Sequence, residues 1–560
     1  MRSRSFITIM RTGLDFPFRL RVGVTGQRIL GETDKPAEGI RRILKQRMPE
    51  LFDHPLSGTG VEPPFAYTIV TPLAEGADRL VAREVLKIPD SDMEVVLPLD
   101  RTDYLRDFST PASKEDFEEL LGQARKIVRL KESPPRDPRT VPDLMAVRNK
   151  AYEDAGRYVV DHSDVLIALW DFTPSQGQGG TADIVAYARE KRSPLAIVSL
   201  KDPGAIVMEK GRGLSRRTLD RIGLFNRFPV SAEKERAYTG AMEQKLFQNA
   251  EGGKISPAVR SLIKAKLLPS YVRASLIAKK NRKKYLRAGL LVYSLSPLAV
   301  AAVAAGSLSP SWAPFAYGLE FVLLIVIYMV IFLADRKKVH AKWVEARALI
   351  ERIRGAIFLS ACGVEASPII QPPFQEPARR SDDWIFRVFH EIVRRMGPPV
   401  PGDREECGVC VAFVRKHWLH GQIEFHAAKA RRSGKISRRL EISGRAVFLA
   451  AIGAAGWHLS SIMIGHPSIL AGLEKPVTFF ALVLPAVGAA VGGIRLHREY
   501  SRLEKRSRDM EAALTELDRE FSRIVDFSRL KTLLIEAEAL MLQETQDWFR
   551  LMKFAKVEVI

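Results

Sequence analysis

Apolar positions divide the chain into a first part with short hydrophobic runs and a second part with long ones. Between residues 19 and 200, apolar runs of five to eight residues alternate with stretches of helical periodicity. We expect strands at 19–25, 67–71, 93–99, 164–171 and 194–200. We expect helices at 36–52, 74–86, 113–124, 145–161 and 179–191. Near-continuous Val, Ile and Leu strands between helices predict an α/β fold, a Rossmann-like doubly wound parallel sheet.

The second part of the chain contains four stretches that are nearly free of charge, at 288–308, 314–334, 446–464 and 477–494. A membrane span needs about 20 apolar residues, so we expect an all-α region with four transmembrane helices in two hairpins. Basic segments flank the hairpins, at 279–287, 335–342, 429–439 and 495–506. The loop between the two spans of each hairpin carries almost no positive charge. The positive-inside rule therefore predicts a multi-pass inner (cytoplasmic) membrane protein with its N- and C-terminal regions in the cytoplasm.

Six segments follow from these patterns along the chain. They are a Rossmann-type domain at 1–230, a basic helical connector at 231–287, a first transmembrane hairpin at 288–334, cytosolic helices with a Pro-rich linker at 335–445, a second hairpin at 446–494, and a C-terminal helical segment at 495–560. A basic helix precedes each hairpin and a long helix follows it, which indicates a duplicated unit.

The C-terminal segment carries apolar residues at the spacing of a coiled-coil seam, namely Leu503, Met510, Leu514 and Leu517. This spacing fits two arrangements. In one, which we expect, the helix joins a bundle formed with other copies of the chain, so that the protein is a homo-oligomer. In the other, it is an ordinary amphipathic helix packed within one chain.

Charge and cysteine content restrict the partners of the protein. Lys and Arg total 86 against 65 Asp and Glu, a net charge of +21 that fits nucleic acid or anionic lipid. Much of the excess flanks the spans, so we expect membrane lipids and no nucleic acid polymer as partners. Three cysteines exclude a disulfide framework. Cys407 and Cys410 precede His417 and His420, but the spacing is too short for a zinc finger, and we expect no metal.

Unusual residues gather where the expected strands end, and ligands of parallel α/β sheets bind beyond these carboxyl ends. They are Gly23, Thr25, Gly26 and Arg28 with the first strand, Glu75, Gly76 and Asp78 after the second, and Trp170, Asp171, Gly177, Gly179, Gly180, Thr181 and Asp183 after the fourth. The glycines let the backbone approach a ligand closely. A helix that begins near Thr181, with Thr181 as its cap, would direct N–H groups at an anion. We therefore predict a nucleotide-type pocket.

The side chains in this set suggest separate roles in such a pocket. Arg28, Arg79 and Arg148 can pair with phosphate charge. Trp170 can stack on a base. The acidic residues can accept ribose hydroxyls or act on a glycosidic bond; they are Glu75, Asp78, Asp171 and Asp183.

Each of these features also has a plain structural interpretation. Gly-Gly-Thr at 179–181 is a common way to start a helix, and Arg28 on its own is an ordinary solvated charge. Asp183 can complement the dipole of the helix it begins, and Trp170 can belong to the core. A dinucleotide-dependent dehydrogenase is disfavoured, because Gly23-x-x-Gly26 is not the G-x-G-x-x-G pattern.

Five blocks of the first part closely resemble the SLOG superfamily, the Rossmann-like group that links lysine-decarboxylase-like LOG proteins with the DprA family. The blocks are GVTGQR, PLAEGADRLVA, VVLPL, RNKAYEDAGRYVVDHSDVLIALWD and GQGGTADIVAYAR, within residues 19–200. The membrane region that follows resembles the SLATT type of two-helix membrane effector in its topology. The resemblance implies a sensor of a nucleotide-derived ligand that triggers membrane disruption in bacterial conflict or anti-phage systems.

The resemblance also implies roles for individual residues. Gly179, Gly180 and Thr181 match the phosphate-binding Gly-Gly-Thr of the family; Thr25, Gly26 and Arg28 match its first loop, where relatives have His in place of Gln27; Gly76 and Asp78 match its Gly-Ala-Asp block; Arg148 and Asn149 match its Arg-Asn pair. LOG enzymes, which hydrolyse cytokinin nucleotides, carry a Glu three residues after the Thr of this motif. Here the acid is Asp183, one residue earlier and shorter.

We therefore expect a membrane-anchored sensor and effector that binds a nucleotide or nucleotide-derived second messenger and needs no separate cofactor. This interpretation favours binding over catalysis but leaves enzymatic activity open. The alternative is a membrane-tethered nucleotide N-glycosidase, a LOG-like phosphoribohydrolase that uses Arg148 with Glu75 or Asp183. A third interpretation is a channel or transporter that is gated by the first domain.

Overall fold

The computed structural model describes residues 15–55, 62–130, 144–175, 179–202, 204–247, 255–365, 384–397, 407–464 and 473–554. The chain forms two compact units. The sheet unit comprises Met1–Pro229 together with Pro373–Glu391. The helical unit comprises Val230–Pro372 together with Ile392–Ile560.

The sheet unit contains a seven-stranded sheet in the order β4-β3-β2-β1-β5-β6-β7. Its strands are β1 (Phe18–Gly26), β2 (Phe65–Thr71), β3 (Asp92–Leu97), β4 (Lys126–Arg129), β5 (Val165–Trp170), β6 (Leu195–Ser199) and β7 (Ile206–Glu209). All neighbours are parallel except β6 and β7. The expected doubly wound parallel sheet is confirmed. The edge strands β4 and β7 were not expected, because each has only four residues, none of them buried, and so lacks a buried apolar run.

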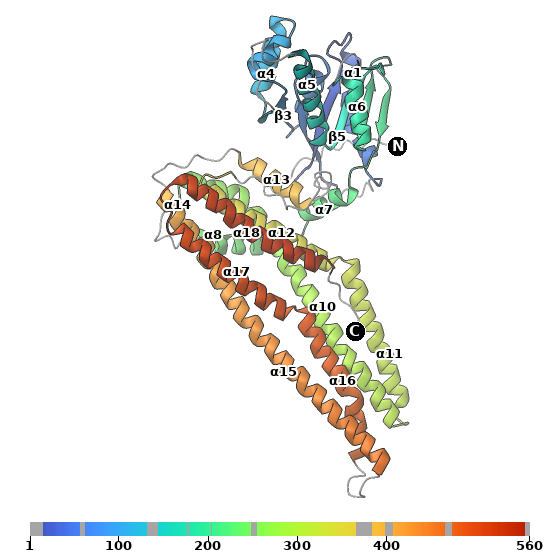
Figure 1. Ribbon diagram of the computed structural model, residues 1–560. Helices are drawn as coiled ribbons and strands as arrows, with labels where there is room; N and C mark the ends of the chain where they lie inside the picture. Colours follow the sequence, from blue (N-terminus) through green and yellow to red (C-terminus); the bar gives the residue numbers. More distant parts are fainter. Residues whose placement is uncertain are drawn as a thin grey trace. The chain divides into compact units, whose positions relative to one another are not determined.

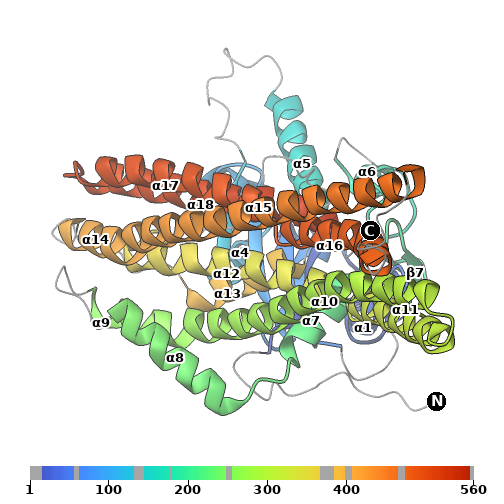
Figure 2. The same ribbon diagram turned by 90° about the horizontal axis from the view of Figure 1, so that it is seen from below.

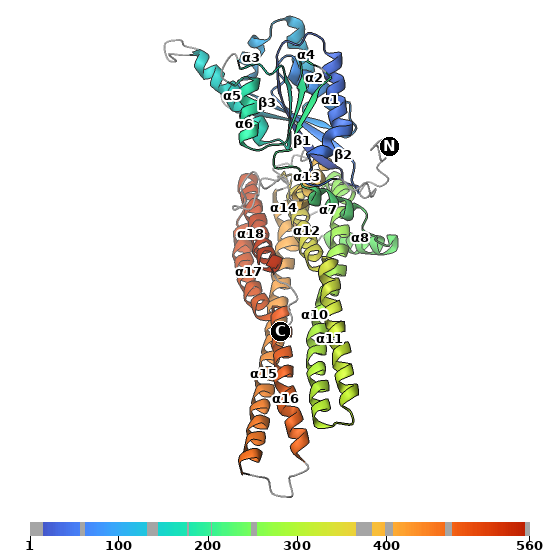
Figure 3. The same ribbon diagram turned by 90° about the vertical axis from the view of Figure 1, so that its right-hand side faces the viewer.

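Helices cover both faces of this sheet, as Figure 3 shows for α1 and α2 on one side and α5 and α6 on the other. The helices of the unit are α1 (Asp34–Arg42), α2 (Ala77–Leu86), α3 (Arg101–Tyr104), α4 (Pro111–Gly122), α5 (Leu144–Asp161), α6 (Thr181–Glu190) and α7 (Arg216–Asn226). Val159, Ile184 and Val185 of α5 and α6 are buried against Leu166 and Ile197 of the sheet. Burial on both faces explains why the central strands are almost uninterrupted runs of apolar residues.

A helix from the Pro-rich region completes the sheet unit. The sequence predicted cytosolic helices with a Pro-rich linker at 335–445; residues 384–391 of α13 (Trp384–Met396) pack at the amino ends of β1 and β5. The Arg387 guanidinium makes two hydrogen bonds to Asp164, of 2.7 and 3.1 Å. Arg19 Nε donates to Glu391 Oε2 at 2.8 Å, and both side chains are almost fully buried. The sheet unit is therefore assembled from two stretches of chain that lie far apart in the sequence.

The helical unit contains two helical hairpins. Its helices are α8 (Ala232–Phe247), α9 (Pro257–Leu262), α10 (Leu268–Leu308), α11 (Ala313–Arg336), α12 (Val339–Ala361), α14 (Cys407–Val414), α15 (Gly421–Ile464), α16 (Glu474–His497), α17 (Tyr500–Phe521) and α18 (Phe527–Phe554). Figures 1 and 2 show α10 beside α11 and α15 beside α16, and α10 also packs against α16. Within the described residues, four helices are long and apolar enough to cross a membrane, so the chain is a membrane protein.

The two halves of the helical unit repeat the same order of elements. A short helix and a π-helical turn, at Ile263–Leu267 and at Arg415–His420, precede each long first helix of a hairpin. The returning helices α11 and α16 both have 24 residues. Each ends in a two-residue break whose second residue is left-handed, Lys338 (φ +48°) and Glu499 (φ +52°). These two residues lie 161 positions apart (338 and 499), as do the starts of α12 and α17 (339 and 500). The structure thus shows the repeat that the sequence indicated only weakly.

The apolar seam of α17 is used within one chain. Met510, Leu514 and Leu517 are buried, and α17 packs against α15 and α18 of the same chain. Of the two arrangements that the spacing allowed, the structure therefore shows the intrachain one for this face.

Candidate functional site

The order of the strands places the carboxyl ends of β1 and β5 side by side, where the sheet changes its direction of winding. β1 pairs in parallel with β2 on one side and with β5 on the other. Open α/β sheets bind their ligands in the crevice outside such a switch point. The loops that follow β1, β2 and β5 meet there through the contacts described below.

Two glycines allow the first two of these loops to touch. Gly76, at φ +77°, lies so close to the loop after β1 that a Cβ atom would stand 2.3 Å from the Arg28 carbonyl oxygen. The Ala77 N–H donates to the Gln27 carbonyl oxygen at 3.0 Å. A Cβ on Gly26 would stand 2.4 Å from the Ala77 methyl and 2.9 Å from a carbonyl oxygen of β5. The start of α2 and the end of β1 are therefore fixed to each other by backbone contact.

Gly23 and Thr25 lie within β1 itself. Gly23 pairs with β2 and β5, and a Cβ there would meet Ser163 and Val159 at 2.7 and 2.8 Å. Its absent side chain thus makes room for α5 under the sheet, three residues before the strand ends. Thr25 pairs with Ala168 of β5 and is half buried.

Asp78 holds the turn between β2 and α2 together. Its carboxylate accepts hydrogen bonds from the Ala74 N–H at 3.1 Å and from the Thr71 hydroxyl at 3.2 Å. Burial raises the pKa of this carboxyl to about 7. Arg79, which follows it, donates to the Leu73 carbonyl and to Ser113 and is also buried. Both side chains therefore serve the local fold at this loop and do not reach toward an open crevice.

Glu75 is bound to the start of α4. Its Oε1 accepts hydrogen bonds from the Ser109 N–H and hydroxyl, both at 3.1 Å, and from the Ser113 hydroxyl. Burial alone would raise the pKa of the Glu75 carboxyl, but these hydrogen bonds outweigh burial and keep the pKa below its usual range. Glu75 is therefore ionised at neutral pH.

The loop after β5 is closed by its own side chains. Trp170 Nε1 donates to the Thr173 carbonyl at 3.0 Å, and the indole packs against Phe172. Asp171 accepts hydrogen bonds from the Thr173 N–H and hydroxyl, and the hydroxyl bond lowers the pKa of the Asp171 carboxyl. The Gln27 side chain lies near enough to Asp171 to contribute to this lowering of the pKa, so the loops after β1 and β5 approach each other at the switch point.

The start of α6 approaches α5 through a glycine. Gly179, at φ +82°, lies where a Cβ would stand 2.9 Å from the backbone of Glu153. The Gly179 N–H donates to Asp183 Oδ2 at 3.1 Å. Gly180 is the N-cap and has no side chain, while the Ser175 hydroxyl accepts a hydrogen bond from the Asp183 N–H of the first turn at 3.2 Å. The expectation that Thr181 caps it is therefore wrong, since Thr181 is the first helical residue. Gly177 lies outside the described residues.

A cluster of charged and aromatic side chains borders the same edge. The Arg28 guanidinium lies 5.2 Å from the centre of the Tyr152 ring and is exposed. Arg148 donates to Asp107 Oδ1 at 2.5 Å, and the Tyr152 hydroxyl donates to Asp107 Oδ2. Asn149 follows Arg148 on α5 and is half buried. The structure thus brings Arg28 and Arg148 to one cluster, as the predicted pocket required.

Sequence reasoning missed Tyr152 and Asp107. Tyr152 lies four residues after Arg148 on a predicted helix, so its place on the same face was available from spacing. Asp107 arrives from the connection between β3 and α4, and its spacing gave no signal.

The Cys-x-x-Cys segment lies in the helical unit. Cys407 and Cys410 are buried on α14. His417 packs against an aromatic ring at 5.0 Å, and His420 Nε2 lies 3.1 Å from Asp518. The two histidines therefore have other neighbours than the two thiols.

The chain was also compared with known proteins. No protein-family model matches it, and no curated protein matches it either. The fold and the geometry of the sheet edge are therefore the features that indicate a function.

Proposed function

We propose that this chain is a membrane-anchored sensor and effector whose sheet unit binds a nucleotide-derived ligand and signals to the transmembrane hairpins. One observation carries the proposal. At the β1–β5 switch point, backbone-fixed loops and two guanidinium groups, Arg28 and Arg148, meet at one edge of a doubly wound sheet. This is the place where such sheets bind nucleotides.

The groups at this edge suit a phosphorylated ligand. Arg28 is exposed, so its guanidinium is available to a phosphate. Arg148 is paired with a single carboxylate, Asp107, and both side chains are about one-fifth exposed. A phosphate can replace that carboxylate as the partner of Arg148. The first turn of α6, with glycine at its N-cap, adds backbone N–H donors on the same edge.

The same geometry favours binding over hydrolysis. An N-glycosidase needs an acid or base placed at the ribose. Glu75 is ionised and held by two serines, and Asp183 accepts a hydrogen bond from its own turn. The two acids of the alternative mechanism therefore already have structural partners, and the glycosidase serves as the competing outcome of the test.

The wider assignment follows from the same proposal. The sheet unit would act as a SLOG-like sensor and the hairpins as SLATT-like effectors in a bacterial conflict or anti-phage system, in a homo-oligomer. The basic flanks of the hairpins favour a cytoplasmic location for both ends of the chain. The ligand can shift the equilibrium between two arrangements of the membrane helices only by the difference in its binding free energy for the two arrangements.

The test requires the full chain, because residues 384–391 belong to the sheet unit and a fragment that ends at residue 230 would lack them. We would purify the protein in detergent and measure its melting temperature with nucleoside mono- and diphosphates, cyclic oligonucleotides, NAD and ADP-ribose. Each sample would also be assayed for released base. At about 100 times Kd, a ligand stabilises the fold by ~2.7 kcal/mol. Arg28→Gln and Arg148→Gln should each remove most of the shift.

Arg157→Gln is the matched control. Arg157 lies on the same helix as Arg148 and is also paired with a carboxylate, that of Glu153 at 2.6 Å. It lies more than two turns farther from the sheet edge that carries the cluster. Released base that disappears in Glu75→Gln or Asp183→Asn would make the protein an enzyme. A panel without any stabilising ligand, or equal losses in Arg148→Gln and Arg157→Gln, would reject the proposed site.

A further inference from the structure

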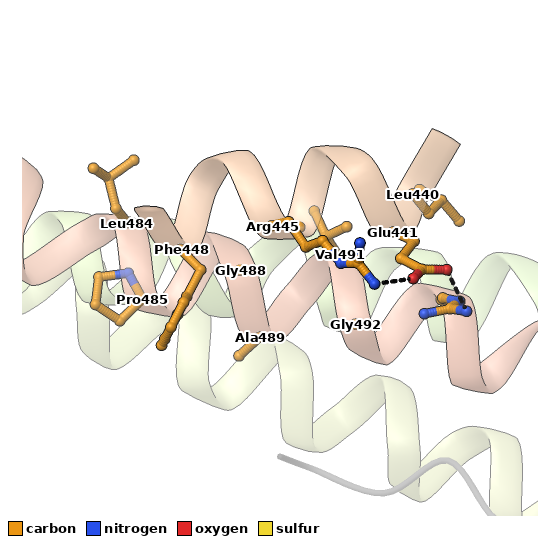
Figure 4. Close-up of a pocket in the computed structure, with 12 residues that line it drawn as sticks. Leu440, Glu441, Arg445, Phe448, Leu484, Pro485, Gly488, Ala489, Val491 and Gly492 are labelled. Atoms are coloured by element: carbon orange, nitrogen blue, oxygen red, sulfur yellow. Dashed lines mark hydrogen bonds and ion pairs between the residues drawn. The ribbon is translucent and has the colours of Figure 1, made fainter. Parts of the chain in front are cut away.

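A groove of about 550 Å³ lies between α15 and α16 of the second hairpin (Figure 4). Figure 4 shows Phe448, Leu484 and Pro485 at its apolar end. Gly488 and Gly492 line its middle. A Cβ on Gly492 would meet nothing within 4 Å, and one on Gly488 would make only an ordinary contact with α15 at 3.7 Å. The groove is therefore open space along the surface of the hairpin.

Charged side chains line the other end of the groove. One oxygen of Glu441 accepts a hydrogen bond from Arg445 at 2.6 Å, and the other accepts one from Arg495 at 3.0 Å. Arg495 is also held by the hydroxyls of Ser437 and Ser501, each at 3.2 Å. Two guanidinium groups thus share one carboxylate, which leaves a net positive charge at this end. The Arg445 side chain is 75% exposed, so it can turn toward an incoming anion.

The surroundings add to this positive charge. Burial, together with the charges of three further arginines, lowers the pKa of the Arg282 guanidinium on α10. Those arginines are Arg347, Arg432 and Arg498. Arg498 lies three residues beyond Arg495, so it is the member of this group that follows the charged end of the groove along the chain.

The length of the groove matches one leaflet of a bilayer. From Pro485 to Arg495 the groove follows ten residues of α16, or about 15 Å at the helical rise. The hydrocarbon core of a bilayer is about 30 Å thick, so half of it has this depth. A phospholipid with the end of one acyl chain at the apolar end of the groove would therefore have its phosphate near Arg445 and Arg495.

The first hairpin provides an internal comparison. At the positions 161 residues earlier, Ile327 and Ile331 stand in place of Gly488 and Gly492, and Ala334 stands in place of Arg495. Ile327 is buried. The repeat thus keeps the hairpin in both halves but has the glycines and the arginine of the groove only in the second.

We propose that the groove between α15 and α16 binds one anionic phospholipid, with an acyl chain along Gly488 and Gly492 and the phosphate between Arg445 and Arg495. Basic pockets between transmembrane helices at the cytoplasmic side suit such headgroups. A second copy of the chain is the other candidate occupant, because small residues such as these glycines let two helices approach closely. In a symmetric contact between two copies, the two Arg445 side chains would approach each other and repel. This repulsion favours a lipid over a second copy as the occupant of the groove.

The test is native mass spectrometry of the full chain in a non-ionic detergent, titrated with palmitoyl-oleoyl phosphatidylglycerol and, separately, with the matching phosphatidylcholine. The wild-type protein should bind the first lipid at least tenfold more tightly. Arg445→Gln should weaken this binding about fivefold, the change that corresponds to ~1 kcal/mol for one basic residue at a charged surface. Gly492→Ile, which installs the residue of the first hairpin, should abolish the tight site.

Two controls separate this site from general effects. Gly456→Ile changes a glycine of α15 that also has open space around it but does not line the groove. Arg336→Gln removes an exposed arginine at the end of the first hairpin. Neither should change phosphatidylglycerol binding.

The proposal is overturned by equal affinity for the two lipids, or by equal losses in the controls. Displacement of the lipid by free glycerol phosphate would assign the arginines to a soluble anion instead. A dimer that Gly492→Ile converts to monomers, with phosphatidylglycerol binding unchanged, would assign the groove to a second copy.

Discussion

Gly76→Ala tests whether the loops at the sheet edge are fixed in the way the structure indicates. Gly76 has φ +77°, a region that residues with a side chain rarely adopt. Its added Cβ would stand 2.3 Å from the Arg28 carbonyl oxygen and 2.5 Å from that of Gln27. Since ordinary contacts begin near 3.4 Å, the loop after β1 has to move by about 1 Å.

The cost has two sources. A non-glycine residue in a sparsely populated backbone region costs about 1–3 kcal/mol. Overpacking against neighbours that are backbone, and so cannot turn away, costs about 1–3 kcal/mol more. The expected loss in the free energy of local unfolding is therefore ~2–6 kcal/mol. Even the lower value corresponds to a roughly 30-fold change in an opening equilibrium.

Hydrogen–deuterium exchange on the full chain measures this loss where it arises. Amides at 24–30 and 74–80 should exchange at least about 30-fold faster in Gly76→Ala than in the wild-type protein. Ligand-induced stabilisation should fall as well, because Arg28 moves with the loop. Gly122→Ala in α4 is the control, since a Cβ there meets nothing within 4 Å. It should be neutral or stabilise by up to ~1 kcal/mol. Exchange in Gly76→Ala within twofold of the wild-type rate would refute the reasoning.

Three further substitutions test buried charges. Burial raises the pKa of Asp78 to about 7 from 3.8, so its stabilising contribution is complete below pH 4 and is lost as pH rises through 7; the unfolding free energy of wild type relative to Asp78→Asn should fall by up to ~4 kcal/mol over this range in urea titrations. Burial likewise raises the pKa of Glu538 on α18 to about 7 from 4.5, so Glu538→Gln should raise Tm at pH 8 and leave it unchanged at pH 4. The side chains of Arg387 and Asp164 are 10% and 4% exposed, and Arg387→Gln leaves the Asp164 carboxylate without its guanidinium partner. A broken buried pair costs ~3 kcal/mol, so amide exchange at 385–391 should become roughly 150-fold faster.

Much of the fold could be predicted from the chain because burial leaves a clear pattern. β1, β2, β3, β5 and β6 lie within two residues of the expected strands, since each is a buried apolar run. β4 has the sequence Lys-Ile-Val-Arg, and Ile127 at its centre is 46% exposed. It therefore lacks the buried apolar run by which the other strands were predicted. Cytosolic helices were expected within 335–445, but the docking of α13 on the sheet was not, because Asp164 and Arg387 are 223 residues apart.

The candidate site was predicted less well for a physical reason. Residue types at strand ends show which groups are available, but not which of them the fold itself uses. From the sequence, Glu75 has the features of a ligand-binding acid. In the fold, its carboxylate accepts hydrogen bonds from Ser109 and Ser113, which lie 34 and 38 residues away in the sequence. Arg28 and Arg148 keep the predicted place at the edge, since both follow directly from where a strand ends and a helix begins.

In a sensor of this kind, ligand binding at one edge of the sheet has to have an effect at the opposite edge. The proposed ligand lies at the carboxyl ends of β1 and β5. The chain leaves the sheet unit after residue 229 and again after 391, and α13 packs at the amino ends of the same strands. β1 has nine residues, so these edges are about 30 Å apart. If the ligand changes how firmly α13 is docked, thermodynamic reciprocity requires that loosening α13 changes ligand affinity by the same factor. Arg387→Gln, far from the cluster at Arg28, would then shift Kd, whereas a binding domain without any coupling to the membrane helices through α13 would keep the wild-type value.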